Sequence, residues 1–122
     1  MLRINYQHML TAGDMTLTLH SAPLELAYML GYCIQATYSG APVGTLILEG
    51  SNDVPNPMDA NFQYAAFIPT NWTTIANSSV AISGPDAVLI NVSGVYYRYV
   101  RATYTPTSGS GALTIVGNAK GF

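Results

Sequence analysis

Residues 96–104 read YYRYVRATY, and this stretch decides the fold class because it combines aromatic, β-branched and small residues without Gly or Pro. Such a composition is typical of a β-strand, in which successive side chains point to opposite faces. The alternation yields two sets of side chains: Tyr97, Tyr99 and Arg101 on one face, and Tyr96, Arg98, Val100 and Tyr104 on the other. Val100 and Ala102 mark the core face, so Tyr97, Tyr99 and Arg101 are predicted to point outward.

The same period of two recurs along most of the chain. It predicts strands at residues 2–7, 15–20, 26–38, 43–49, 72–75, 79–82, 87–92, 96–104 and 112–119. Residues 26–38 are apolar on both faces, as in a central strand covered on both sides, and Gly31 within them predicts a bulge or a close backbone approach. Residues 43–49 are predicted to be the hairpin partner of this strand. About eight or nine strands with no helix predict an all-β protein, a single antiparallel β-sandwich of jelly-roll type over residues 1–122.

An irregular Pro- and Asn-rich insert is predicted at about residues 50–70. It contains Pro55, Pro57 and Pro69, interspersed with Asn52, Asp53, Asn56, Asp59 and Asn61. Loops of this length within compact domains usually have a function.

The charge content is low. Four Lys or Arg and six Asp or Glu make up 8% of the residues and leave a net charge of −2. Four cations cannot neutralise a run of phosphates or bind an anionic membrane surface, so neither nucleic acid nor membrane is expected as a partner. We expect a protein that begins at Met1 in a cytoplasm, with no signal peptide and no membrane-spanning helix. Cys33 is expected to be a buried bystander.

Catalytic and cofactor motifs are not apparent. His8, His20 and Cys33 lack metal-ligand spacing, and residues 108–111 (SGSG) lack the Lys and helix of a phosphate loop, so a hairpin turn is expected there. The acidic insert leaves calcium binding open, beside the simpler reading that Asn and Asp cap turns. We therefore predict no enzyme activity, no cofactor and no metal.

A protein interface is the favoured site. Tyr and Arg are enriched at interface hot spots, although a cross-strand aromatic ladder within one sheet would explain the same residues. The predicted interface residues are Leu2, Arg3, Tyr6, Pro55, Pro57, Met58, Phe62, Tyr97, Tyr99 and Arg101. Trp72 is expected in the core.

Several phrases resemble a known class of proteins. They are 48–53 (LEGSND), 72–75 (WTTI), 97–105 (YRYVRATYT) and 119–122 (AKGF). Over about residues 45–122 the chain resembles the small β-sandwich virion structural proteins of tailed bacteriophages, which are described as head-decoration or cement proteins. It departs from them in the Pro-rich insert at residues 54–69.

The resemblance implies a non-enzymatic decoration protein on the capsid surface of the virion, made in the cytoplasm of the bacterial host. Its partners would be the lattice of the major capsid protein and further copies of itself, and a trimer at a three-fold position of the shell is one option. The alternatives are a carbohydrate-binding, host-recognition sandwich on a head or tail fibre, with Trp72 stacking on sugars, and a tail or neck component.

Overall fold

The structure is a computed structural model that describes residues 3–54 and 67–121, with Arg3 described by its backbone alone. These residues contain ten β-strands and no helix, so none of them forms an apolar helix long enough to cross a membrane. The predicted all-β class is confirmed.

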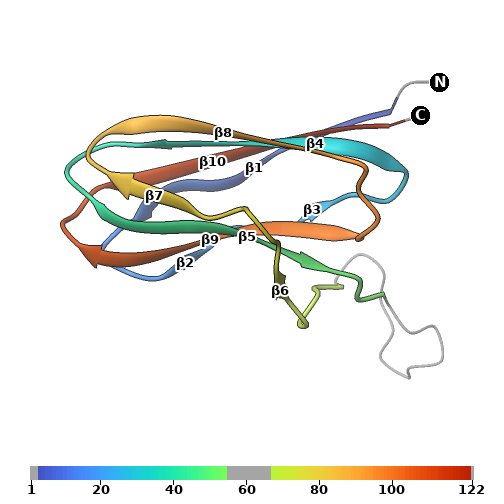
Figure 1. The fold of residues 1–122 in the computed structure, drawn as a ribbon, viewed down its shortest axis with the longest axis horizontal. Coiled ribbons are helices and arrows are strands. Elements are labelled where there is room, and N and C mark those ends of the chain that lie inside the picture. The colour runs from blue at the N-terminus through green and yellow to red at the C-terminus, as the bar shows by residue number, and fades with distance from the viewer. Residues whose placement is uncertain (1–2, 55–66, 122) are drawn as a thin grey trace.

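Four strands form one sheet, in the order β1–β10–β4–β8, and each neighbouring pair is antiparallel. Their bounds are β1 (Arg3–Asp14), β4 (Met29–Tyr38), β8 (Asp86–Ser93) and β10 (Ala112–Gly121). Figure 1 shows this sheet stacked on a second sheet, with the start of β1 and the end of β10 at the same end of the sandwich.

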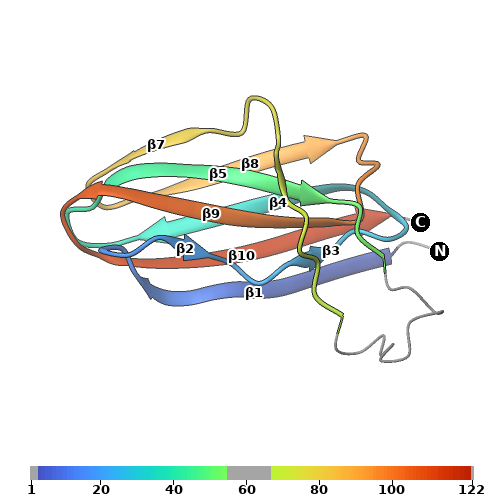
Figure 2. The same cartoon turned by 90° about the horizontal axis from the view of Figure 1, so that it is seen from below.

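The second sheet has six strands, in the order β2–β9–β5–β6, with β3 also pairing with β9 and β7 with β5. Their bounds are β2 (Leu19–His20), β3 (Leu24–Glu25), β5 (Val43–Ser51), β6 (Thr73–Thr74), β7 (Val80–Ser83) and β9 (Tyr99–Ser108). Long strands β5 and β9 form its centre, and Figure 2 shows both nearly full length.

The core lies between the two sheets. It is formed by the apolar side chains that alternate inward, among them Ile34 and Ile115 from the first sheet and Leu46, Leu48 and Val100 from the second. Burying each such side chain contributes roughly 1.5–3 kcal/mol. The period of two predicted from the sequence is therefore confirmed along β4, β5 and β10.

The two predicted hairpins are wrong. β4 and β5 belong to different sheets, and so do β9 and β10, so residues 39–42 and 109–111 are corners that cross the sandwich. The corners bind each other: the Ala41 N–H donates to the Ser110 carbonyl at 2.9 Å and the Ser39 N–H to the Ala112 carbonyl at 3.1 Å. A Cβ on Gly111 would stand 2.0 Å from the Ser39 carbonyl oxygen, so only Gly allows this contact.

The N-terminal strands also differ from the prediction. β1 extends to Asp14, and only Leu19–His20 of the predicted strand at 15–20 is a strand, β2. A turn precedes it, in which the Thr16 N–H donates to the Asp14 carboxylate at 2.9 Å. Met15 is fully buried whereas Leu17 is 58% exposed, because the turn breaks the alternation between them. Residues 26–28 lie outside β4, which begins only after Tyr28 adopts a positive φ of 65°.

Candidate functional site

Tyr99 and Arg101 lie on the outer face of the six-stranded sheet, as predicted, but their own chain covers them. The stretch of residues 67–72, called the 67–72 segment below, contacts both side chains. The Phe67 ring lies 6.1 Å from the Tyr99 ring, and the Arg101 guanidinium lies 4.5 Å over the Trp72 ring. Figure 2 shows the chain crossing this face on its way to β6 and β7. Both side chains are therefore half-buried, and their contacts are with residues of their own chain.

Glu49 forms the polar centre of this face. It is the cross-strand partner of Arg101, whose Nε donates to its Oε1 at 2.9 Å, and the Thr103 hydroxyl donates to the same oxygen. Because that hydroxyl hydrogen is used, Thr103 Oγ1 accepts from His20 Nδ1 at 2.9 Å. The neighbouring strands β2, β9 and β5 thus bring His20, Arg101 and Glu49 together, and Trp72 lies over Arg101 from outside the strands.

Electrostatics hold Glu49 ionised. Burial alone would raise its pKa, but the hydrogen bonds from Thr103 and Arg101 and the Coulombic attraction of Arg101 and His20 outweigh burial and lower the pKa below the usual value. The side chains of Arg101 and Glu49 are only 20% and 15% exposed. Losing one partner would leave the other charge poorly solvated.

Asp53 closes the base of the insert. Its Oδ2 accepts from the backbone N–H groups of Thr70 and Asn71, each at 2.8 Å, and its Oδ1 accepts from the Asn71 amide at 3.0 Å. These bonds, with the Asn71 N–H first, lower the pKa of the carboxyl. Both oxygens are thus satisfied by N–H donors, which supports the turn-capping reading of Asp53 over calcium binding. Among the residues that the structure describes, no three His, Cys, Asp or Glu side chains are grouped to hold a metal, and Asp59 and Asn61 lie outside them.

The predicted outward direction of the Tyr97 side chain is wrong. β9 begins only at Tyr99, so the alternation does not extend to Tyr97. Its ring packs against the core and meets Tyr32 edge-on, with their hydroxyl oxygens 2.5 Å apart. Burial raises the pKa of Tyr97 and, with the bond to Tyr97, that of Tyr32. Tyr96, predicted on the core face, is instead 93% exposed.

The remaining predicted interface residues do not join this site. Tyr6 is 76% exposed on the outer face of the four-stranded sheet, on the opposite side of the sandwich from Tyr99 and Arg101. Leu2, Pro55, Pro57, Met58, Phe62 and the side chain of Arg3 lie outside the described residues. The described part of the set therefore divides between two faces.

Two other expectations are corrected. Trp72 is half-buried outside the core, where its indole N–H donates to the Pro69 carbonyl at 3.2 Å. Cys33 is half-buried and not enclosed, because Tyr32 and Ile34 take the two inward positions on either side of it. β4 is covered on one face only, and not on both as predicted, so the middle residue of this trio faces outward.

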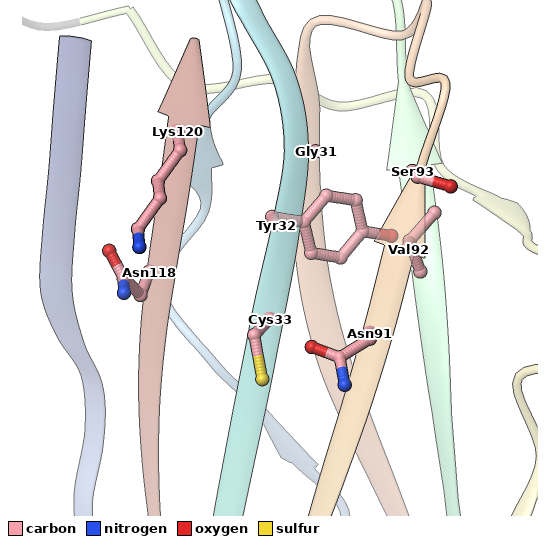
Figure 3. Close-up of a pocket in the computed structure, with 8 residues that line it drawn as sticks. All are labelled: Gly31, Tyr32, Cys33, Asn91, Val92, Ser93, Asn118 and Lys120. Atoms are coloured by element: carbon pink, nitrogen blue, oxygen red, sulfur yellow. The ribbon is translucent and has the colours of Figure 1, made fainter. Parts of the chain in front are cut away.

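The outer face of the four-stranded sheet contains two open hollows that the sequence did not indicate. One, of about 400 Å³, lies between β4, β8 and β10 and is lined by Gly31, Cys33, Asn91, Ser93, Asn118 and Lys120, among others (Figure 3). Gly31 leaves room for it, and the predicted close approach is confirmed, since a Cβ there would stand 2.7 Å from the Val92 carbonyl oxygen.

The second hollow, of about 540 Å³, adjoins the first and is lined by Ile4, Tyr6, Leu89 and Val116 beside Cys33 and Lys120. Leu89 is 64% exposed. The alternation at residues 87–92 predicts this exposure, since Val88, Ile90 and Val92 share the opposite face.

Comparison of the sequence with protein-family models and with curated proteins finds no match.

Proposed function

We propose that this chain is a non-enzymatic structural protein of a tailed-phage virion. It binds the assembled lattice of the major capsid protein, as a head-decoration or cement protein does, and stabilises the shell. The proposal rests on the resemblance of residues 45–122 to such proteins. One structural observation supports it: the phrases LEGSND, WTTI and YRYVRATY lie next to one another beside the insert. Asp53 of the first phrase accepts a hydrogen bond from Asn71. Arg101 and Tyr99 of the third contact Trp72 and Phe67 of the 67–72 segment.

The strand order supports the proposal. When β2 with β3, and β6 with β7, are each counted as one edge of the second sheet, the orders become 1–10–4–8 and 2/3–9–5–6/7. We infer that this is a jelly roll, in which two Greek keys are wound together. Jelly rolls recur in viral capsid proteins, although the fold alone does not imply that function.

The two ends of the sandwich differ in a way that also supports it. Tyr28, Leu30, Val54, Ile68 and Tyr96 are exposed at the end where β4 begins and β5 and β8 end (Figure 1). At the other end the corners consist mainly of Ser, Gly, Ala and Pro, and the large apolar side chains exposed there are Leu17 and Val43. Clustered exposed aromatic and aliphatic side chains are typical of interaction sites. We assign contact with the shell to the apolar end.

In this mechanism the protein binds the assembled shell and not the free capsid subunit. Binding one state alone stabilises that state by mass action, without any chemical step. The low charge content reduces the cost of removing water from a large contact.

The test uses shells assembled without this protein. Purified chain is expected to cosediment with them and to raise their melting temperature. The double variant Tyr96→Ser with Ile68→Ser is expected to bind less, whereas Leu17→Ser, which removes a comparably exposed apolar side chain at the other end, is expected to bind normally. Shells that bind no protein and melt unchanged would refute the proposal.

One observation favours the alternative of carbohydrate binding. A hollow of about 510 Å³ is lined by Asn52, Asp53, Asn71, Thr73 and Tyr97, among others. Amide, hydroxyl and aromatic groups of this kind bind sugars. Recognition of a glycan on an array, abolished by Asn71→Ala while shell binding is absent, would favour this function over decoration.

A further inference from the structure

Strand β8 forms an open edge of the four-stranded sheet. It pairs with β4 over residues 86–93 without any register shift, and among the described residues no strand pairs with its other side. Its backbone is therefore a regular eight-residue template on which another strand could add.

The other sheet edges are protected. β1 is interrupted by register shifts near Leu10, and residues 22–25 cover its outer side: the Ala22 N–H donates to the Met9 carbonyl at 2.8 Å and the Asn5 amide to the Glu25 carbonyl at 3.0 Å. In the second sheet the edge strands β2, β3 and β6 have two residues each, and β7 has four. Short strands and bulges are the usual protection against edge pairing. Among the edge strands of the described residues, β8 alone is both long and regular.

The ladder to β4 identifies which groups of β8 are open. The Gly94 N–H donates to the Leu30 carbonyl at 2.9 Å, so alternate residues before it, such as Val92 and Ile90, direct their backbone groups towards β4. The N–H and carbonyl groups of Leu89, Asn91 and Ser93 therefore point to the open side. The edge has no Lys, Arg or Pro, and its one charged residue, Asp86, lies at one end with its carboxylate accepting from the next backbone N–H.

We propose that β8 pairs antiparallel with β8 of a second copy of this chain, about a two-fold axis at Ile90. The register places Leu89 of each copy opposite Asn91 of the other, so that their open N–H and carbonyl groups bond reciprocally. The two four-stranded sheets become one continuous sheet.

A second copy fits this edge because the contact is self-complementary. The two Leu89 side chains are diagonal neighbours on the outer face, where each covers the other's exposed surface. Each Leu89 also lies next to Asn91 and Ser93 of the partner copy, at the rim of the hollow in Figure 3. No like charges meet at the axis. A two-fold contact implies an even number of copies, in contrast to the trimer considered from the resemblance.

The first test is sedimentation velocity of the purified chain over a range of concentrations. The wild type is expected to dimerise. Leu89→Lys places two cations side by side across the axis and is expected to weaken the dimer roughly tenfold or more. Leu17→Lys, a matched change of an exposed Leu far from β8, is expected to leave the dimer intact.

The second test separates edge pairing from a side-chain effect. Asn91→Pro removes an N–H that faces the open side, so the ladder to β4 keeps all its bonds. Its melting temperature is expected to stay near that of the wild-type monomer while the dimer is lost. In the wild type, hydrogen exchange at Leu89, Asn91 and Ser93 is expected to slow as concentration rises.

A wild type that remains monomeric, or a dimer that survives both Leu89→Lys and Asn91→Pro, would overturn the proposal. It goes beyond the proposed function and does not depend on it. A monomer that still binds shells would refute the β8 contact and leave decoration standing, whereas a β8 dimer that ignores shells would do the reverse.

Discussion

Replacing Arg101 by Met tests whether the outer face of the six-stranded sheet stabilises the fold. The variant keeps the apolar stem but removes the ion pair to Glu49 and the contact with Trp72. Exposed ion pairs contribute about 0–1 kcal/mol, and breaking a buried pair costs about 3–5 kcal/mol. Because these side chains are 20% and 15% exposed, we expect a loss of about 2–3 kcal/mol, which includes the ring contact. This corresponds to a fall of roughly 8–12 °C in melting temperature.

The loss should depend on pH. The pKa of Glu49 is lowered in the folded state, so its contribution is present above the unfolded pKa and is lost as pH falls through the folded pKa. In Arg101→Met the half-buried carboxylate keeps the Thr103 hydroxyl and the attraction of His20 but loses its ion pair, so the charged form is less well stabilised. The difference between wild type and variant is therefore expected to be largest near neutral pH and to shrink below about pH 4.

Urea unfolding of both proteins at about pH 7 and about pH 3.5 measures the effect. Arg98→Met, which changes an exposed Arg outside the strand, serves as the control and is expected to stay within about 0.5 kcal/mol of the wild type. A loss for Arg101→Met as small as that of the control, or one that is equal at both pH values, would refute the reasoning.

Three further predictions concern the corner, the base of the insert and the core. In Gly111→Ala the new Cβ would stand 2.0 Å from a carbonyl oxygen of the neighbouring corner, so the free energy of unfolding measured in urea is expected to fall by more than about 3 kcal/mol. In Gly84→Ala the new Cβ would have no atom within 4 Å and only the φ of 75° is unfavourable, so the fall should be only about 1–2 kcal/mol. Asp53→Ala is expected to speed hydrogen exchange at the two backbone amides that donate to it; Asp86→Ala should not change them, and equal rates in both variants would contradict the clamp. Leu48→Ala is expected to cost about 2–5 kcal/mol, since its side chain is fully buried; a loss below about 1 kcal/mol would mean that it lies outside the core.

Local alternation predicted those parts of the fold that depend on one residue and its near neighbours. The inward rows of β5 and β10, the outward positions of Tyr99 and Arg101 and the close approach at Gly31 all follow from a period of two and from residue size. The predicted outward direction of Tyr97 was wrong because alternation holds only within a strand, and β9 starts two residues later. The predicted core position of Trp72 was wrong because it was argued from the residue type alone. In the structure the ring packs against Arg101, outside the core.

The sequence by itself determined the strand content, the two faces of each long strand and the low charge, because these depend on side chains and on the fixed geometry of extended backbone. Only the tertiary structure decided that residues 39–42 and 109–111 cross between sheets, that Glu49 lies opposite Arg101 and that β8 remains an open edge. A turn of four residues is compatible with a hairpin or with a corner, and the choice depends on which distant strands compete for pairing. The outcome of that competition depends on the packing of the whole core, so it cannot be predicted from any single stretch of the sequence.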